Sequence, residues 1–266
     1  MPDNNLAGLR APLEAIMREA GELARETSRR PFKHWSKGDD DSPVTEGDIA
    51  VNDLLRARLG ELLPAAAWVS EETAGAPERT PSLAWVVDPI DGTRAYIAGR
   101  ADWSISVALV ENARPRLAAL YAPAAEEMFL ATQGAGATLN NGPIAASGGG
   151  ALAGAKLAGP KRYLDKLAAL DASILPQPRV PSLALRLARV AQGALDAAFS
   201  SPGSHDWDLA AADLMVHEAG GLFTDISGAM LSYHAPQAEH GTLLAAGNSR
   251  HHALIDALRD RRGEFA

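Results

Sequence analysis

Residues 83–94 read LAWVVDPIDGTR, an apolar run followed directly by two aspartates and a Gly-Thr pair. The run AWVV predicts a buried strand, because short apolar runs bounded by turn residues are typical of strands in a core. Pro89 favours the second position of a turn, so we expect a tight turn that folds Asp91 back towards Asp88. Two like charges this close disfavour joint ionisation. A divalent cation between them would remove that conflict, since Mg²⁺ prefers oxygen ligands.

The residues after Asp91 indicate an anion beside that cation. Gly92 lets backbone N–H groups approach a ligand closely. The following TRAYIAG (93–99) is expected to begin a helix whose first N–H groups favour an anion. A cation site next to an anion pocket indicates phosphate chemistry. A simpler interpretation stays open at this point, because both aspartates can serve as turn or N-cap residues without any ligand.

The composition restricts the class of protein. The chain has 266 residues, a formal net charge of −8 and no cysteine. The negative charge argues against a nucleic acid polymer or an anionic membrane surface as partner. Without cysteine, disulfides, a thiolate nucleophile and a zinc–thiolate site are excluded. The N-terminal segment lacks the order of a signal peptide, and no apolar run approaches the roughly 18 residues of a membrane span. We therefore expect a cytoplasmic globular protein.

Hydrophobic periodicity predicts helices and strands that alternate along the chain. The segment 32–44 is expected to be an exposed loop or short hairpin, and SGGG (147–150) is the best candidate for a boundary. It would separate an N-terminal α+β lobe (1–150) from a C-terminal α/β lobe (151–266), which together form one compact catalytic unit. Helices are expected over 6–30, from Thr45 onward, over 161–170, 182–192 and 208–219, and from about 250. Strands are expected over 65–72, 84–87, 103–110, 115–121, 127–132, 137–139, 155–158, 194–200, 221–226 and 242–246.

Further acidic residues stand where predicted elements end or begin. Glu71 and Glu72 end a predicted strand, from which side chains can reach a cleft at the edge of a sheet. Asp48 and Asp208 stand at the start of predicted helices. Each has an ordinary alternative: paired glutamates are usual on a solvated loop, and Asp is a favoured N-cap. The stretch Thr45-x-x-Asp48 also resembles a capping box.

The order of these segments resembles the inositol monophosphatase superfamily, a group of lithium-sensitive, Mg²⁺-dependent phosphatases. The group includes inositol monophosphatases and 3′(2′),5′-bisphosphate nucleotidases. The resemblance covers residues 33 to 247, and it implies an α/β (α+β) fold, a layered αβαβα sandwich with two sheets. The motifs that carry it are KGDDDSPVTEGD (37–48), SEE (70–72), DPIDGT (88–93) and WDLAAADLMVHEAGG (207–221).

The resemblance also implies a role for individual residues. Gly92 and Thr93 would place backbone N–H groups on the substrate phosphate, and Glu71 and the Thr93 hydroxyl would orient the attacking water. Asp48 would hydrogen-bond near Thr93 or support a further metal. The implied ligands of two or three Mg²⁺ ions are Glu71, Asp88, Asp91, Asp208 and the carbonyl of Ile90. The substrate contacts would come from Asp91, Gly92, Thr93, Ser204, His205, Asp206 and Asp208.

The run Ser204-His205-Asp206 has two other interpretations. It can be a polar loop without function. A hydrolase triad is rejected, because three consecutive residues on one loop can hardly form the required relay geometry. A multi-metal site explains phosphate binding by an acidic protein better, since the ions supply the positive field.

The substrate is expected to be a small-molecule phosphate ester. SPVT (42–45) and SEE resemble bisphosphate nucleotidases, so our first expectation is 3′-phosphoadenosine 5′-phosphate. The WDLAA segment and GALDAAF (193–199) resemble inositol monophosphatases, which makes an inositol or other polyol phosphate the alternative. In those enzymes a Glu binds inositol hydroxyls, and the nearest positions here are Ser200 and Ser201.

A third interpretation is a mainly non-catalytic interaction protein. Some members of the superfamily bind transcription or ribosome-assembly factors, and a homodimer is among the states that this interpretation allows.

Overall fold

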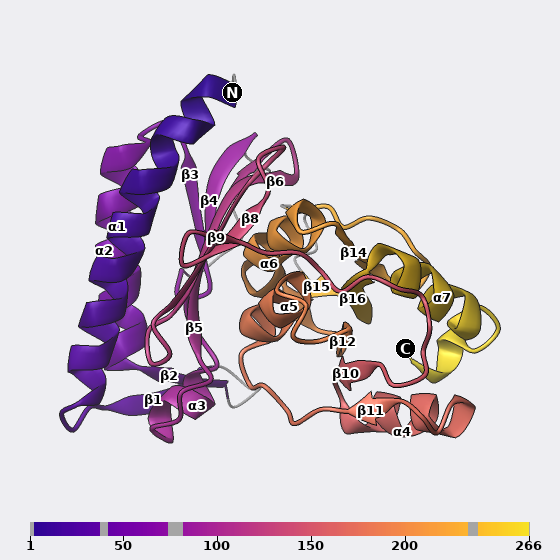
Figure 1. Ribbon diagram of the computed structural model, residues 1–266. Helices are drawn as coiled ribbons and strands as arrows, with labels where there is room; N and C mark the ends of the chain where they lie inside the picture. Colours follow the sequence, from indigo (N-terminus) through magenta and orange to yellow (C-terminus); the bar gives the residue numbers. More distant parts are fainter. Residues whose placement is uncertain (1–2, 38–41, 74–81, 234–238, 266) are drawn as a thin grey trace.

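The computed structural model describes residues 3–37, 42–73, 82–233 and 239–265. Over these ranges helices and sheets stack in five layers (Figure 1). Helices α1 and α2 cover the outer face of a large sheet, and α5 and α6 fill the space between this sheet and a smaller one. Helices α4 and α7 cover the far face of the small sheet. The αβαβα sandwich expected from the sequence is confirmed.

The helices follow the apolar periodicity closely. The first begins before Leu6 and contains Pro12. Thr45 caps the second through a capping box with Asp48, as predicted. Their bounds are α1 (Asp3–Ser28), α2 (Glu46–Leu62), α3 (Thr93–Ile97), α4 (Lys161–Leu170), α5 (Leu183–Ala191), α6 (Asp206–Glu218) and α7 (Asn248–Leu258), followed by the 3-10 turn η1 (Arg262–Glu264).

The large sheet has the strand order β3-β4-β5-β6-β7-β8-β9 within the described ranges. β3 and β4 are parallel, and the later neighbours pair antiparallel as a meander, which agrees with the short turns in the sequence. Its strands are β3 (Ala67–Ser70), β4 (Leu83–Asp91), β5 (Ser104–Glu111), β6 (Arg114–Ala122), β7 (Glu127–Thr132), β8 (Ala137–Leu139) and β9 (Gly142–Pro143).

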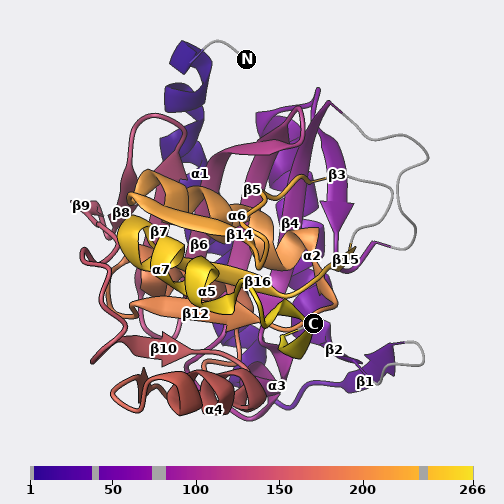
Figure 2. The same cartoon turned by 90° about the vertical axis from the view of Figure 1, so that its right-hand side faces the viewer.

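The small sheet has the order β11-β10-β12-β16-β14 within the same ranges, and Figure 2 shows it with α7 in front. Two short antiparallel pairs lie outside both sheets, β1–β2 and β13–β15. The pairing of β1 with β2 agrees with the hairpin alternative expected over residues 32–44, of which 38–41 lie outside the described ranges. The strands are β1 (His34–Lys37), β2 (Ser42–Thr45), β10 (Lys156–Ala158), β11 (Leu175–Pro176), β12 (Ala197–Ser200), β13 (Ser204–His205), β14 (Gly221–Asp225), β15 (Glu239–His240) and β16 (Leu243–Gly247).

The alternation of side chains along β4 decides which layer each residue joins. Trp85 and Val87 pack under α1 and α2, whereas Val86 faces the central helices. Asp88 follows in the same direction as Val86, because alternate residues of a strand point to opposite faces. The acidic motif therefore opens into the layer that contains α5 and α6.

A β-bulge corrects the tight turn expected at DPID. β4 does not stop before Asp88 but continues to Asp91. Asp88 pairs with Ser106 and Asp91 with Ser104, so three steps along β4 match two steps along β5. In a regular strand these aspartates would point to opposite faces, and the extra residue brings them to the same one. The expected closeness is right, but a bulge produces it.

The chain passes from the large sheet to the small sheet between β9 and β10, where SGGG lies. Helices α5 and α6 come from the second half of the chain but pack in one core with strands of both sheets. The division into lobes 1–150 and 151–266 stays a prediction. None of the helices in the described ranges combines the length and apolar content that crossing a bilayer would require.

Candidate active site

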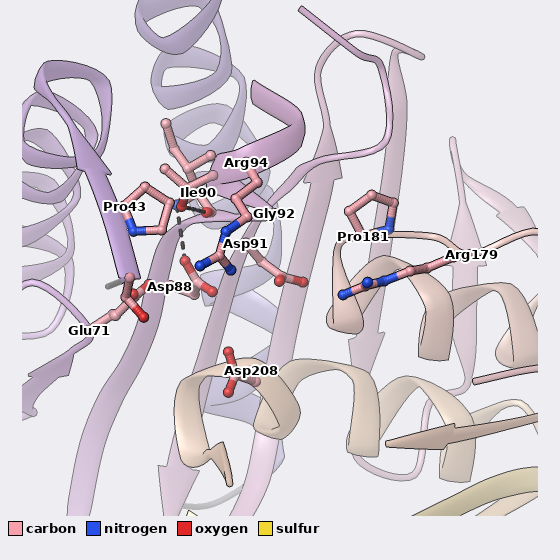
Figure 3. Close-up of a pocket in the computed structure, with 12 residues that line it drawn as sticks. Pro43, Glu71, Asp88, Ile90, Asp91, Gly92, Arg94, Arg179, Pro181 and Asp208 are labelled. Atoms are coloured by element: carbon pink, nitrogen blue, oxygen red, sulfur yellow. Dashed lines mark hydrogen bonds between the residues drawn. The ribbon is translucent and has the colours of Figure 1, made fainter. Parts of the chain in front are cut away.

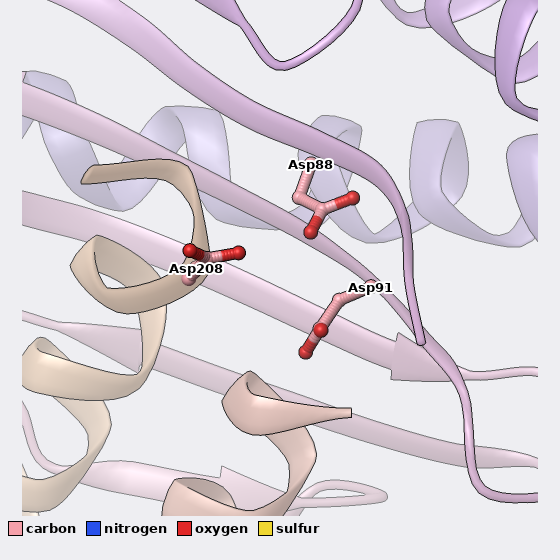
Figure 4. Close-up of side chains that lie close together, drawn as sticks. All are labelled: Asp88, Asp91 and Asp208. Atoms are coloured by element: carbon pink, nitrogen blue, oxygen red, sulfur yellow. The ribbon is translucent and has the colours of Figure 1, made fainter. Parts of the chain in front are cut away.

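Three carboxylates meet where the bulge of β4 faces the first turn of α6. Among the described residues, Asp88, Asp91 and Asp208 each offer an oxygen, and these oxygens all lie within 4.8 Å of one another. Figure 4 shows the three side chains converging from β4 and α6. Asp88 is 1% and Asp91 7% exposed. Asp88 and Asp208 are 120 positions apart in the sequence, and the packing of α6 against β4 brings them together.

The electrostatics of this group favour a cation. Burial raises the pKa of Asp88 well above its usual range, and the nearby Glu71, Asp91 and Asp208 raise it further. Burial, and then Asp91, also raise the pKa of Asp208. Like charges in a low-dielectric site disfavour joint ionisation unless an opposite charge joins them. The donor atoms are carboxylate oxygens, which suit hard divalent cations such as Mg²⁺, so the residues present fit the metal.

Asp91 is held in place by the start of α5. Its Oδ2 accepts hydrogen bonds from Ser182 Oγ and from the backbone N–H of Ala184, both at 2.6 Å, and its Oδ1 accepts one from Leu183 N at 3.1 Å. Burial raises the pKa of Asp91, and these hydrogen bonds offset part of that rise. We did not assign Ser182 from the sequence, although a Ser before a predicted helix is an N-cap signal.

Asp48 and Thr93 form a second polar group beside the bulge. Thr93 Oγ1 lies 3.3 Å from Asp48 Oδ1 and donates to the carbonyl of Ile90 at 3.0 Å. Asp48 Oδ2 accepts from the backbone N–H and the hydroxyl of Thr45. Asp48 is therefore the third helical residue of the capping box, in which Thr45 is the N-cap, and it is the expected neighbour of Thr93.

Gly92 joins β4 to the short helix α3 with a left-handed φ of 93°. A Cβ at this position would lie 3.2 Å from Ser182 N and 3.3 Å from Asp102 O. Glycine suits this position because the left-handed backbone strains other residues and because a Cβ would crowd the backbone of Ser182 and Asp102.

A cavity of about 190 Å³ opens onto these residues (Figure 3). Two arginines face this cavity, Arg94 from α3 and Arg179 from the segment before α5. Neither was identified from the sequence. No motif in the surrounding PQPRVPS marks Arg179. Glu71, a predicted ligand, lines the cavity beside Asp88 but stands outside the group of mutually close oxygens. The remaining lining residues are Ser42, Pro43, Asp88, Ile90, Asp91, Gly92, Thr93, Pro181 and Asp208.

Ser204, His205 and Asp206, which were expected to contact the substrate, lie at and just before the start of α6 and are not among the residues that line this cavity. Ser204 is buried and donates to the carbonyl of Ser201 at 3.2 Å. His205 stacks on Trp207, and its backbone N–H donates to Asp208 Oδ2 at 2.7 Å. Asp206 is 3% exposed and lies 2.7 Å from Nε2 of His240. His205 thus positions a carboxylate of the metal group, and direct substrate contacts from these three residues stay a prediction.

A model of the inositol monophosphatase family matches residues 6–263. The chain belongs to this family. It is 35% identical over 226 residues to "Nus factor SuhB" of Pseudomonas aeruginosa, a match that covers 79% of this chain and 83% of the relative. It is also 35% identical to "Inositol monophosphatase 3" of Solanum lycopersicum, with 79% and 83% covered. The solved IMPase of Thermotoga maritima superposes with a TM-score of 0.83 at 25% identity, and covers 95% of this chain and 97% of that one.

Family membership and the acidic group together establish the type of enzyme. The protein is a metal-dependent phosphomonoesterase of the inositol monophosphatase family, and Asp88, Asp91 and Asp208 form its divalent-metal site. The relatives named here carry inositol monophosphatase or SuhB names rather than nucleotidase names.

Proposed function

We propose that this enzyme hydrolyses a small polyol phosphate, with an inositol monophosphate as the first candidate, and that Mg²⁺ is its metal. The observation that carries the proposal is the buried group Asp88, Asp91 and Asp208 at the wall of a cavity of about 190 Å³. The relatives named inositol monophosphatase support the polyol leaving group. They favour it over 3′-phosphoadenosine 5′-phosphate, which was our first expectation from SPVT and SEE.

The protein groups have separate tasks in this proposal. Asp88, Asp91 and Asp208 hold the ions together with Glu71 and the Ile90 carbonyl. When bound, two or three Mg²⁺ ions neutralise the phosphoryl oxygens and the leaving oxygen and make water a stronger nucleophile at neutral pH. Gly92 and Thr93 donate backbone N–H groups to the phosphate. This arrangement is supported by the position of both residues at the cavity wall.

Glu71, Thr93 and Asp48 orient the attacking water. Glu71 lines the same cavity as Asp88, which places a carboxylate near the reacting phosphate. The Thr93 hydroxyl lies between Asp48 and the Ile90 carbonyl, so its orientation is fixed before substrate binds. Positioned hydrogen-bond partners of this kind lower the entropy loss on reaching the transition state.

A second candidate function is an interaction role, in which the protein acts mainly through a partner protein. The observation that favours it is the name "Nus factor SuhB" carried by relatives at 35% and 31% identity. The homodimer and the cytoplasmic location expected from the sequence stay predictions under both candidates.

A phosphate-release screen tests the proposal. Purified protein would be assayed with Mg²⁺ on inositol 1-phosphate, 3′-phosphoadenosine 5′-phosphate and sugar phosphates, with and without Li⁺. We expect Mg²⁺-dependent release that Li⁺ inhibits, and a higher kcat/KM for the polyol phosphate than for the nucleotide. A strong preference for the nucleotide would reverse our ranking. Partners that a catalytically inactive Asp88→Asn variant still binds from the host extract would favour the interaction role.

A further inference from the structure

Arg179 brings a positive charge to the metal site from the segment before α5. It lines the cavity of about 190 Å³ described above, which we call the metal cavity, together with Asp88 and Asp91. Figure 3 shows its guanidinium group directed towards Asp91. Pockets for drug-sized ligands begin at about 300 Å³, so a phosphate in this smaller space lies close to every wall. A bound phosphate would therefore have a guanidinium group beside it.

The chain around Arg179 is held in place at both ends. Three of the residues 176–182 are prolines, which fix φ and favour an extended backbone for the residues before them. At one end Gln177 N donates to a carbonyl of β10 at 2.8 Å, and at the other the Ser182 hydroxyl donates to Asp91 at 2.6 Å. A side chain carried by such a segment loses less freedom when it binds an anion.

The charge of Arg179 is not balanced by a neighbouring carboxylate. Among the described residues, Arg179 forms no hydrogen bond or ion pair with an acidic side chain. The guanidinium group of Arg186 differs, because it is buried behind Asp91. Burial lowers the pKa of Arg186, Asp91 raises it, and the like charge of Arg179 lowers it again. Arg186 is thus compensated by Asp91, whereas Arg179 remains available to an anion that enters the cavity.

The balance of charges in the metal cavity indicates which anion Arg179 binds. Four carboxylates line this cavity, and two Mg²⁺ ions would balance their charge. A phosphate monoester adds about 1.5 to 2 negative charges near neutral pH. Either a third ion or a guanidinium group of the protein can offset this added charge. Guanidinium donors match the geometry of phosphate oxygens, so Arg179 is suited to the task.

We propose that Arg179 is a catalytic residue that donates hydrogen bonds to the phosphate being hydrolysed. It supplies part of the positive charge that a third ion would otherwise bring. The phosphate group is common to every candidate ester, so this role rests on the phosphatase activity and not on the choice of a polyol as leaving group.

Two binding measurements on the full chain test this role apart from turnover. Inorganic phosphate would be titrated into the Mg²⁺-loaded protein in a calorimeter, and Mg²⁺ into the phosphate-free protein. Arg179→Gln should weaken phosphate binding about 10- to 100-fold, the range of one hydrogen bond to a charged group. It should leave Mg²⁺ binding no weaker, because the cation that it removes repels the ions. Weaker binding of both would indicate a damaged metal site and overturn the proposal.

Two further variants separate the charge of Arg179 from its shape. Arg179→Lys keeps the charge but loses the planar fork of donors, so its phosphate affinity should lie between those of the wild-type protein and Arg179→Gln. Arg179 is exposed, and these variants should fold. The control is Arg58→Gln, since Arg58 pairs with Glu19 on the exposed side of α1 and α2. Phosphate affinity within about twofold of wild type in Arg179→Gln, as expected for the control, would overturn the proposal.

Two substrates with different leaving groups show which part of the ester Arg179 contacts. Inositol 1-phosphate and para-nitrophenyl phosphate share only the phosphate group. Arg179→Gln should therefore lower kcat/KM for both by a similar factor. A loss confined to inositol 1-phosphate would place Arg179 at the leaving group and refute the contact with the reacting phosphate. If the wild-type protein hydrolyses inositol 1-phosphate poorly or not at all, the polyol proposal fails, and the phosphate titration still decides the role of Arg179.

Discussion

The charge of Asp88 is hard to keep in the folded protein without a cation. Asp88 is 1% exposed, and burial together with Glu71, Asp91 and Asp208 raises its pKa. Asp88→Asn removes one of these like charges and a metal ligand. We expect kcat to fall by more than about 100-fold, since even partners behind metal ligands cost about 10- to 100-fold when removed. Mg²⁺ should raise the Tm of the wild-type protein, because it binds the folded state, and this rise should disappear in Asp88→Asn.

The fold of this variant should persist without metal, because the substitution removes unfavourable repulsion rather than packing. Its Tm in EDTA should be at least that of the wild-type protein. Asp256→Asn is the matched control, since Asp256 is an exposed aspartate of α7 paired with Arg259. A fully active Asp88→Asn enzyme that still responds to Mg²⁺ would refute the metal assignment.

His251 makes the stability of the protein sensitive to acid. It is 2% exposed, its Nε2 lies 2.9 Å from Thr224 Oγ1, and burial lowers its pKa to about 4. The unfolded pKa is about 6.5, so between these values the unfolded state binds more protons than the folded state. The free energy of unfolding should therefore fall as pH decreases from about 6.5 to about 4.

His251→Gln tests this pH dependence by removing the titrating ring while keeping a polar group near Thr224. We expect Tm to fall less between pH 6.5 and pH 4.5 in this variant than in the wild-type protein. The exposed neighbour His252 provides the control. His252→Gln should retain most of the wild-type loss, because burial lowers the pKa of His251 more than the charge of His252 does. An equal loss of Tm in all three proteins would show that His251 is not the responsible group.

At the scale of elements, apolar runs and helical spacing predicted most helices and strands. The meander after β4 and the amphipathic helix α4 follow from these patterns, and so do α5 and α6, which are buried on most sides between the two sheets. The bulge in β4 did not, since the extra residue is visible only through its pairing with β5. The contact of Asp91 with Ser182 joins residues 91 positions apart, and Arg179 enters the site from a segment without a motif. Tertiary packing creates such contacts, so local sequence carries no signal for them.

Ser182 connects the start of α5 to the metal site and is a positioning residue. Its Oγ accepts from Leu185 N at 3.0 Å and donates to Asp91 at 2.6 Å. Ser182→Ala should lower the free energy of unfolding by about 1 kcal/mol, the usual effect of losing an N-cap. Because Asp91 also becomes less constrained, more Mg²⁺ should be needed for half-maximal activity. The two readouts are urea denaturation and a Mg²⁺ titration of the rate.

Ser104→Ala is the control for Ser182→Ala. Ser104 pairs with Asp91 as a strand neighbour, but its hydroxyl contacts the Ser182 hydroxyl at 2.9 Å rather than the Asp91 carboxylate. The Mg²⁺ requirement of Ser104→Ala should change less. Unaltered Mg²⁺ dependence in Ser182→Ala would refute the positioning role.

The junction of β4 and α3 requires glycine for two separable reasons. Gly92 and Gly99 both have a left-handed φ, of 93° and 67°. Only at Gly92 would a Cβ meet neighbouring backbone, whereas nothing lies within 4 Å of it at Gly99. Gly99→Ala should cost about 1–2 kcal/mol from the backbone conformation alone. Gly92→Ala should cost more and should also lower kcat. Urea denaturation of both variants measures the difference, and equal losses would show that crowding by Ser182 and Asp102 has no effect.

At the scale of the whole molecule, the central core belongs to both halves of the chain. Val86 and Phe129 of the large sheet share one cluster with Leu187 of α5, Met215 of α6 and Phe223 of the small sheet. Residues 1–150 alone would leave the inner face of the large sheet exposed to water. The active site has the same dependence, because Asp88 and Asp91 come from the first half and Asp208 from the second.

The two halves should therefore fold as one cooperative unit. We expect urea denaturation of the full chain to give coincident transitions by tryptophan fluorescence and far-UV circular dichroism, with one m-value. A fragment 1–148 should lack a cooperative transition and bind the dye ANS, because exposed apolar surface is the mark of an incompletely packed state. A chain cleaved at an inserted protease site between the exposed Gly148 and Gly149 is the control, and its two pieces should stay associated with near-native stability. Cooperative unfolding of the isolated fragment would instead establish 1–150 as an independent lobe, since it would mean that the large sheet is stable without α5 and α6.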